Sequence, residues 1–283
     1  MYYLLKGFGH LLCRLSPEAL DRLARGLAYL TFDIIRLRRR LILRNIEIAL
    51  GNETSASERV LMGRQSMRHF FLTVFETLRA VGSDVVAHVE VEGREHAQPA
   101  LDAGKGAYIL ICHIGNWEVL GGAGSRYGAH THALVKEIGK GGANRLVDEL
   151  RHRIGWTPIY RKPPAEAIRK IRAAMKRGEL VGIMMDQARP GAPRLPFFGQ
   201  PAKTLTILAS LWRKSPAPVI PISIHRMSPT RHALKVWPPL TFKTLDDPKQ
   251  ADIENTILCN QMLETMIRHT PEQYFWLHNR WKA

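Results

Sequence analysis

The chain has 283 residues, a formal net charge of +16 and three cysteines. This length suits one α/β domain with a full hydrophobic core, and the widely spaced cysteines form no C-x-x-C pair, which argues against a zinc-bound or disulfide-stapled scaffold and favours a reducing compartment. The excess of basic residues predicts an anionic partner, such as an anionic membrane, nucleic acid, an acidic protein or a phosphate-bearing substrate.

The first 50 residues predict amphipathic helices. Ser16 is a helix-capping residue followed by proline, and apolar residues then recur with helical spacing from Leu20 to Ile34. Five arginines follow between Arg36 and Arg44 with no acidic residue among them. This pattern favours a helix that lies on a membrane surface; the alternative is a helix that packs on its own domain with a solvated basic end. We therefore expect a membrane-associated helical segment at 1–50 and a catalytic domain at 51–283.

From residue 54 onward the chain predicts a long helix and then an alternating series of strands and helices. The helix at 54–81 starts with a capping box of Ser55 and Glu58. Periodicity then predicts strands at 85–93, 107–113, 131–136, 156–160 and 180–186. Between and after them it predicts helices at about 116–127, at 143–154, at 164–177 with Gly178 as the C-cap, and at about 250–269. Two further strands are predicted at 217–226 and 232–240, and antiparallel pairing of these two is one option.

Such alternation is typical of an α/β fold with a mostly parallel central sheet flanked by helices on both faces. Ligands of these sheets bind at the carboxyl ends of the strands. His113 and Asp186 each end an apolar run, so we expect both side chains at the same edge of the sheet.

The stretch HIGNWE at residues 113–118 carries the candidate chemistry. If His113 ends a strand and Gly115 and Asn116 form the turn, Glu118 falls in the first turn of the next helix, where its carboxylate can reach back to the imidazole. A carboxylate on one ring nitrogen fixes the tautomer and leaves the other nitrogen to act as a base. The alternative is a strand-end histidine that is merely satisfied by hydrogen bonds.

The chain offers no obvious nucleophile of its own. Cys112 is expected to point to the opposite face from His113, and no G-x-S-x-G motif is present. We therefore expect His113 to activate a hydroxyl or amine of the substrate. No H-E-x-x-H or phosphate-loop motif occurs, so no metal is predicted.

Several blocks resemble the bacterial lipid A biosynthesis acyltransferases, the lauroyl and myristoyl transferase family, within the superfamily of lysophospholipid and glycerolipid acyltransferases. HIGNWE resembles the H-x4-[D/E] signature of that family. Further blocks resemble its other motifs in the same order from about residue 35 to the end of the chain: RRRLILRNIEIAL, NRLVDELRHRIG, GELVGIMMDQ, LPFFGQPAKT, APVIPISIHR and PEQYFWLHNRWK. One such block is weak evidence, but six in collinear order are strong.

The resemblance implies transfer of an acyl chain from a thioester donor, which is acyl-loaded acyl carrier protein or acyl-CoA, to a hydroxyl of a lipid acceptor. It also implies that the protein works at the cytoplasmic face of the bacterial inner membrane as a peripheral or monotopic protein. Because the thioester is already activated, no cofactor is expected. His113 matches the family's general base and Glu118 its orienting acid. Arg151 matches a family arginine that binds acceptor phosphate or stabilises oxyanion charge; its alternative is a solvated helix arginine.

Three other residues belong to the predicted substrate-binding set. Asn116 either caps a helix or touches substrate, Asp186 is expected to anchor the site, and Lys203 either faces phosphate or is an ordinary loop lysine. The chain also departs from the family pattern. Where the family commonly has an acidic or glycine-rich run after Asp-Gln, this sequence has Arg189 and Arg194.

These departures leave the acceptor open between a lipid A precursor, a lysophospholipid, an aminolipid and another glycolipid. Two rival hypotheses come from other classes. The basic composition alone would suit a nucleic-acid-binding protein, but no known nucleic-acid-binding signature is visible, so we expect no nucleic acid. An inert lipid-binding scaffold is the other rival, and the intact His113 and Glu118 argue against it.

Overall fold

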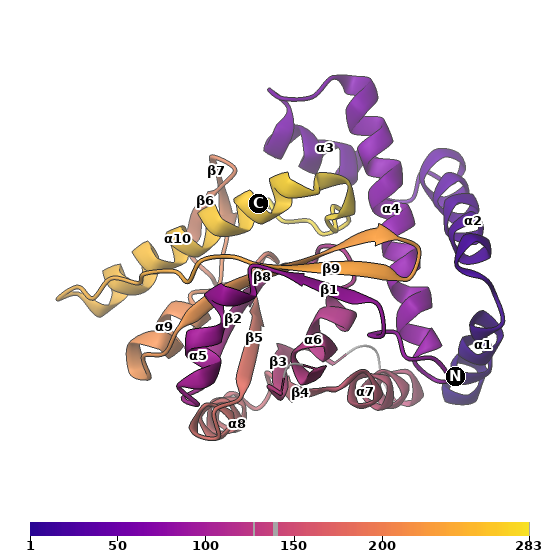
Figure 1. Cartoon of the computed structure of the whole chain (residues 1–283). Coiled ribbons are helices and arrows are strands. Elements are labelled where there is room, and N and C mark those ends of the chain that lie inside the picture. The colour runs from indigo at the N-terminus through magenta and orange to yellow at the C-terminus, as the bar shows by residue number, and fades with distance from the viewer. Residues whose placement is uncertain (127, 138–140, 283) are drawn as a thin grey trace.

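The computed structural model describes residues 1–126, 128–137 and 141–282. Its centre is a seven-stranded sheet in the order β1-β9-β8-β2-β5-β3-β4 (Figure 1), in which every neighbouring pair is parallel except β8 and β9. The strands are β1 (Val89–Glu92), β2 (Ala107–Ile111), β3 (Thr131–Val135), β4 (Trp156–Tyr160), β5 (Leu180–Met184), β8 (Val219–Ser228) and β9 (Arg231–Val236). This confirms the predicted α/β fold with a mostly parallel sheet.

Helices cover both faces of the sheet (Figure 1). A separate antiparallel hairpin, β6 (Arg194–Phe197) and β7 (Gln200–Lys203), packs against the last long helix. The helices are α1 (Tyr2–Cys13), α2 (Pro17–Ala28), the π-helical η1 (Tyr29–Ile34), α3 (Arg39–Leu50), α4 (Ala56–Arg79), the short η2 (Arg94–His96), α5 (Gln98–Asp102), α6 (Trp117–Arg126), α7 (Gly142–Ile154), α8 (Pro164–Lys176), α9 (Ile207–Lys214), α10 (Pro248–His269) and η3 (Pro271–Gln273).

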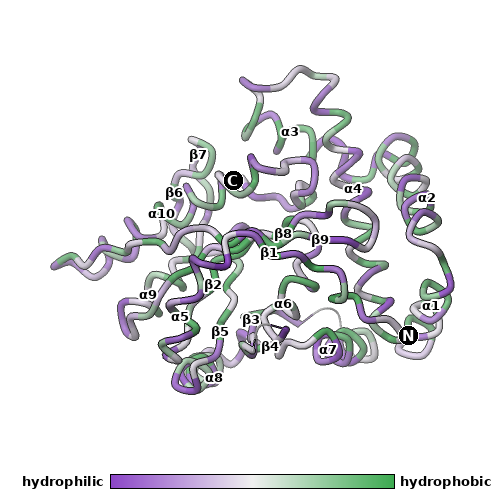
Figure 2. The backbone as a smooth tube through the Cα atoms, in the orientation of Figure 1, coloured by the Kyte–Doolittle hydropathy of each residue, from purple (hydrophilic) through white to green (hydrophobic). Residues whose placement is uncertain are grey.

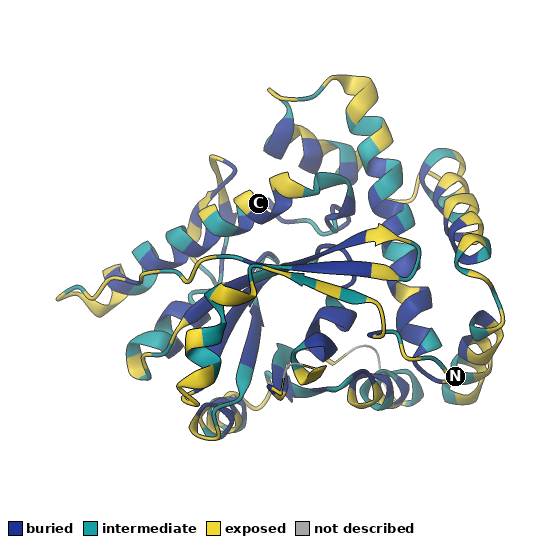
Figure 3. Ribbon diagram, in the orientation of Figure 1, coloured by how far each residue is buried: buried dark blue, intermediate teal, exposed yellow. Residues whose placement is uncertain are grey.

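Strand β2 is buried on both faces and divides the core in two. Its alternate residues Tyr108 and Leu110 join the apolar cluster under α8, α9 and α10, whereas Ile109 and Ile111 join the cluster under α6 and α7. Figure 3 shows the central strands as the most buried part of the molecule, with exposed residues on the outer faces of the helices. A continuous apolar run is what a central parallel strand requires.

Most predicted elements agree with the structure to within a few residues. The capping box of Ser55 and Glu58 is present at the start of α4, and β8 and β9 form the antiparallel pair. The predicted strand at 85–93 is wrong over its first half, because only Val89–Glu92 pairs with the sheet. The hairpin β6–β7 and helix α9 had no counterpart in the sequence prediction.

The N-terminal helices pack against α4 (Figure 1). Ser16 caps α2 as predicted, and Leu12, Leu20, Phe32 and Ile42 are buried in the two core clusters. The outer faces of these helices carry exposed apolar side chains, and apolar and polar residues alternate along them in Figure 2. Among the residues described here, no helix is long and apolar enough to cross a bilayer. Membrane association of residues 1–50, and a domain boundary there, stay predictions.

Candidate active site

A tight turn after β2 places His113 at the carboxyl edge of the sheet. Gly115 has φ +57°, and a Cβ atom there would lie 2.2 Å from the carbonyl oxygen of Ile224, so this position requires glycine. The Asn116 side-chain oxygen then accepts two backbone N–H groups in the first turn of α6, both at 3.2 Å. The predicted strand, turn and capped helix are confirmed.

The His113 imidazole is held by Asp186. Nδ1 lies 2.8 Å from Asp186 Oδ1 and 3.1 Å from Oδ2, and the His113 backbone N–H donates to Oδ2 at 2.9 Å. Because a carboxylate accepts its hydrogen bond from Nδ1–H, the lone pair of the imidazole is on Nε2. Burial acts to raise the pKa of the Asp186 carboxyl, but the His113 ring and backbone N–H outweigh it and hold that pKa below its ordinary value.

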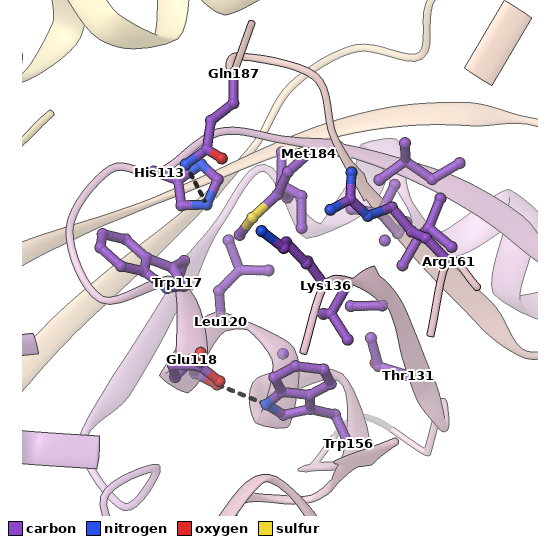
Figure 4. A pocket seen from close by; sticks show the side chains of 18 of the residues that line it. His113, Trp117, Glu118, Leu120, Thr131, Lys136, Trp156, Arg161, Met184 and Gln187 are labelled. Atoms are coloured by element: carbon purple, nitrogen blue, oxygen red, sulfur yellow. Dashed lines mark hydrogen bonds between the residues drawn. The ribbon is translucent and has the colours of Figure 1, made fainter. Parts of the chain in front are cut away.

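The other ring nitrogen of His113 faces a cavity of about 320 Å³. The Gln187 side-chain amide nitrogen lies 3.3 Å from Nε2, and the rings of Trp117 and Phe275 pack edge-on and tilted against the imidazole. Figure 4 shows Gln187 above the imidazole and Trp117 beside it. Nε2 of His113 therefore lies beside aromatic rings and is open on the cavity side.

Glu118 does not hold His113, so the predicted His113–Glu118 pair is wrong. The Glu118 carboxylate accepts two hydrogen bonds from Arg151, from Nε at 3.1 Å and from Nη2 at 3.0 Å. The physical reason is that the buried α7 guanidinium needs a carboxylate beside it, whereas the imidazole already has Asp186. Glu118 and Arg151 do line the same cavity as His113, and the Arg151 guanidinium packs over the Trp156 ring.

The remaining predicted substrate-binding residues lie apart from the cavity or behind it. Asn116 is fully buried and uses its side-chain oxygen as a helix cap and its amide to donate to Glu76, so the capping alternative is confirmed and substrate contact is not. Asp186 lies behind the imidazole and takes the contact that was predicted for Glu118. Lys203 belongs to β7 and does not line this cavity.

Several cavity residues were not in the predicted set. Gln187, Lys136, Arg161 and Arg189 all follow the carboxyl ends of strands, and Trp117 and Phe275 supply its aromatic wall. The signal that could have found the polar ones is their place directly after apolar strands, the same rule that located His113 and Asp186.

The C-terminal tail closes the site from behind. The Phe275 backbone N–H donates to the carbonyl of His113, and Gly115 donates to the carbonyl of Gln273. Burial, with the Asp186 carboxylate beside it, raises the pKa of the Tyr274 hydroxyl well above its ordinary value. The aromatic tail is mostly core packing, as predicted, but Phe275 also reaches the cavity.

A buried charge network on α4, β8 and β9 supports the turn from the other side. Glu76 accepts hydrogen bonds from Arg226 Nη2 at 2.7 Å, from Arg226 Nε at 3.1 Å and from the Asn116 amide at 2.7 Å. His69 Nδ1 lies 2.7 Å from Arg226 Nη1, and His232 lies 3.4 Å from the Glu76 carboxylate. Although burial acts to raise the pKa of Glu76, Arg226 holds it well below the ordinary value. The carboxylate thereby ties Asn116, and with it the start of α6, to the core.

Glu76→Gln should destabilise the protein by about 3–5 kcal/mol, because it leaves the Arg226 guanidinium buried without its counter-charge. The free energy of unfolding in urea measures this. Glu90→Gln is the matched control, since Glu90 pairs with Arg231 on the surface and its loss should cost less than about 1 kcal/mol. Equal effects of the two substitutions would contradict the role of Glu76.

Acid should destabilise the protein through two histidines. Burial and the neighbouring Arg226 lower the pKa of His69 to about 2, and burial lowers the pKa of His278 to about 4. Below about pH 6.5, the ordinary pKa of a free histidine, both imidazoles become protonated in the unfolded chain but stay neutral in the folded chain. The free energy of unfolding is therefore highest above about pH 6.5 and decreases as the pH falls below it.

Urea unfolding at pH 7, 6 and 5 tests this, with a loss of roughly 2 kcal/mol per histidine expected by pH 5. His69→Gln keeps an acceptor for Arg226 and should flatten the dependence. His88→Gln, at an exposed histidine, is the control. If His69→Gln and His88→Gln have the same pH dependence as the unsubstituted protein, the buried histidine is not responsible.

Known proteins resemble this chain along its whole length. Residues 1–283 match the family model described as bacterial lipid A biosynthesis acyltransferase. A lipid A biosynthesis lauroyltransferase of Escherichia coli (strain K12) is 26% identical over 286 residues, which cover 96% of this chain and 88% of that protein. The lipid A biosynthesis palmitoleoyltransferase of the same organism and a lipid A biosynthesis acyltransferase of Shigella flexneri are each 25% identical over 264 residues, covering 88% of this chain and 80% of each relative.

Proposed function

The chain belongs to the bacterial lipid A biosynthesis acyltransferase family, and we propose that it transfers a fatty acyl chain from a thioester donor to a hydroxyl group of a lipid A precursor. The donor is acyl carrier protein or acyl-CoA, and no cofactor is required because the thioester is already activated. The observation that carries the proposal is the His113 imidazole, held on Nδ1 by a buried carboxylate, with Nε2 open to a cavity.

In the proposed reaction Nε2 of His113 takes the proton of the acceptor hydroxyl as its oxygen attacks the thioester carbonyl carbon. The carbon–sulfur bond then breaks, and the departing sulfur receives the proton from Nε2, so the imidazole returns to its first state. Asp186 stabilises the imidazolium between the two proton transfers and keeps the ring oriented. The Gln187 amide lies where the hydroxyl must enter, so it gives way to the acceptor or hydrogen-bonds to it.

The Glu118–Arg151 pair has a different role in this proposal. It neutralises a buried guanidinium in the wall of the cavity. In the described part of the chain Arg151 Nη1 has no hydrogen-bond partner, and its nearest carboxylate is that of Asp148, whose Oδ1 lies 3.8 Å away. That donor is available to the thioester oxygen when negative charge develops on it during attack.

The cavity has an apolar side that suits a fatty acyl chain. Ile109, Ile111, Leu120, Ile183 and Met184 line it below the base. Figure 4 shows Leu120 and Met184 close to His113, with Thr131 further away from it. Burying methylene groups against such side chains supplies about 0.8 kcal/mol per group, so the acyl chain itself would contribute to binding.

We also propose that the protein works at the cytoplasmic face of the inner membrane, attached by its N-terminal helices. Leu4, Phe8 and Leu11 lie one helical turn apart on α1 and are all exposed. The segment 34–38 at the end of η1 is exposed throughout and carries three apolar residues and two arginines. Apolar side chains beside cations fit the interface of an anionic bilayer.

Asp186→Asn should lower the rate of acyl transfer by roughly 10²–10⁴-fold, because the imidazolium loses its counter-charge, and His113→Ala should abolish transfer. Mass spectrometry of the acylated product, formed from an acyl thioester and a lipid A precursor, measures both. Asp252→Asn, which removes a partly buried carboxylate that pairs with Arg213 outside the cavity, is the control and should keep the full rate. A folded Asp186→Asn variant with an unchanged rate would contradict the assignment of the base.

Replacing Ile34, Ile35 and Leu37 together by serine should weaken binding to vesicles that contain phosphatidylglycerol, because three exposed apolar contacts are lost. Each fully inserted side chain contributes roughly 1.5–3 kcal/mol, so at least a tenfold loss is expected. Vesicle flotation measures it, and Met227→Ser, at an exposed methionine on β8, is the control. Flotation of the triple variant equal to that of Met227→Ser would remove this segment from the proposed contact.

A further inference from the structure

Three basic side chains line the cavity at the ends of three neighbouring strands. Arg189 follows β5, Lys136 follows β3 and Arg161 follows β4, and these strands are adjacent in the sheet. The row starts at β5, which is the neighbour of β2 in the sheet. His113 lies just after the end of β2. Figure 4 shows Lys136 and Arg161 extending into the cavity from the side opposite Trp117.

Among the described residues, no acidic group at the cavity forms an ion pair with this row, although the nearby Asp186 carboxylate attracts the Arg189 guanidinium. Asp186 is bound to His113, Glu118 is bound to Arg151, and Glu137 is exposed at the rim. In the described ranges, 1–126, 128–137 and 141–282, none of the three basic side chains forms an ion pair. Residues 138–140, beside Lys136, contain no Asp or Glu.

The two arginines are partly withdrawn from water without gaining partners. The Nε atoms of Arg161 and Arg189 are buried and have no hydrogen-bond partner among the described residues. Burial, together with the nearby Arg189 charge, lowers the pKa of Arg161. An unsatisfied buried donor costs about 1–3 kcal/mol, and two neighbouring cations repel each other, so a cavity built this way gains stability when an anion enters.

We propose that Arg161, Arg189 and Lys136 form a binding site for a phosphate group of a substrate. The inference rests on the proposed acyl transfer and adds the chemical class that the far end of the cavity recognises. Guanidinium groups bind phosphate through paired hydrogen bonds, and a phosphate monoester carries nearly two charges, which matches three cations better than a single carboxylate does.

The location of the site restricts how a substrate lies. Strand β4 is three strand spacings from β2, which places Arg161 roughly 14 Å along the sheet edge from the His113 strand. The phosphate is therefore not at the reacting carbon. It belongs either to the acceptor lipid, at a distance from the hydroxyl that reacts, or to the pantetheine arm of the donor, at a distance from the thioester.

Binding of inorganic phosphate to the full chain in detergent tests the site without any turnover. Isothermal titration should show that Arg161→Gln and Arg189→Gln each weaken phosphate binding at least tenfold, whereas Arg194→Gln, an exposed arginine of the β6 strand outside the cavity, leaves it unchanged. Arg189→Lys should recover part of the affinity because it keeps the charge and loses the paired geometry. Acetate at equal ionic strength should bind far more weakly.

Thermal unfolding in phosphate-free buffer shows that the variants fold, since removing an unpaired cation should leave the melting temperature unchanged or raise it. Phosphate affinity that is equal in the unsubstituted protein, Arg161→Gln and Arg189→Gln overturns the proposal, as does acetate binding as tight as phosphate binding.

Steady-state kinetics identify the source of the phosphate. If Arg161→Gln and Arg189→Gln raise the KM for the acceptor tenfold, and do not raise it for an acceptor without phosphate, the bound phosphate is that of the acceptor. If they instead raise the KM for the donor tenfold, the bound phosphate is that of the pantetheine arm. If neither KM changes in Arg161→Gln and Arg189→Gln, no substrate uses the site and the proposal fails. His113→Ala separates the two hypotheses, because it should bind phosphate normally and transfer no acyl chain. Transfer by that variant would refute the catalytic proposal and leave the phosphate site standing.

Discussion

The contact between His113 and Asp186 depends on the register of two parallel strands. Ile111 of β2 lies opposite Met184 of β5, and the same offset of 73 residues continues two residues further to His113 and Asp186. The pair is therefore built by the sheet itself, at the point where both strands run out. A one-residue slip between parallel strands would turn one of these side chains to the other face. Contacts from α4 and from the C-terminal tail hold the turn behind the pair in place.

Buried ion pairs provide much of this support, and two of them lie next to the turn. Glu76 with Arg226 anchors Asn116 and the start of α6, while Glu118 with Arg151 ties α6 to α7. Buried ion pairs of this kind contribute little net stability, but separating the two charges costs about 3–5 kcal/mol because each is left buried without its partner. Arrangements that separate the pairs are therefore disfavoured. The turn after β2 and the start of α6 are consequently fixed by α4, by α7 and by the C-terminal tail, three segments that are far apart in the sequence.

The sequence predicted what depends on local pattern. Strand and helix periods located the elements, the Gly115–Asn116 turn and its cap were correct, and the rule of carboxyl ends placed His113 and Asp186 at one edge. It failed where a choice between distant partners was needed. Glu118 is close to His113 in sequence, yet Arg151, 33 residues away, binds it. Neither that choice nor the adjacency of β5 to β2 can be derived from spacing, because both depend on the strand order of the whole sheet.

The strand order also explains how one edge brings together the His113 imidazole and a row of basic side chains. Following the sheet from β2 through β5 and β3 to β4, the edge carries His113, then Gln187 and Arg189, then Lys136 and Arg161. His113 is paired with the Asp186 carboxylate, whereas the basic side chains lie further along the edge, so positive charge increases with distance from His113. A substrate with one phosphate and several hydroxyls would enter this gradient in a single orientation. The hydroxyl that meets His113 would then be selected by its distance from the phosphate, so that choice would rest on the spacing of four parallel strands.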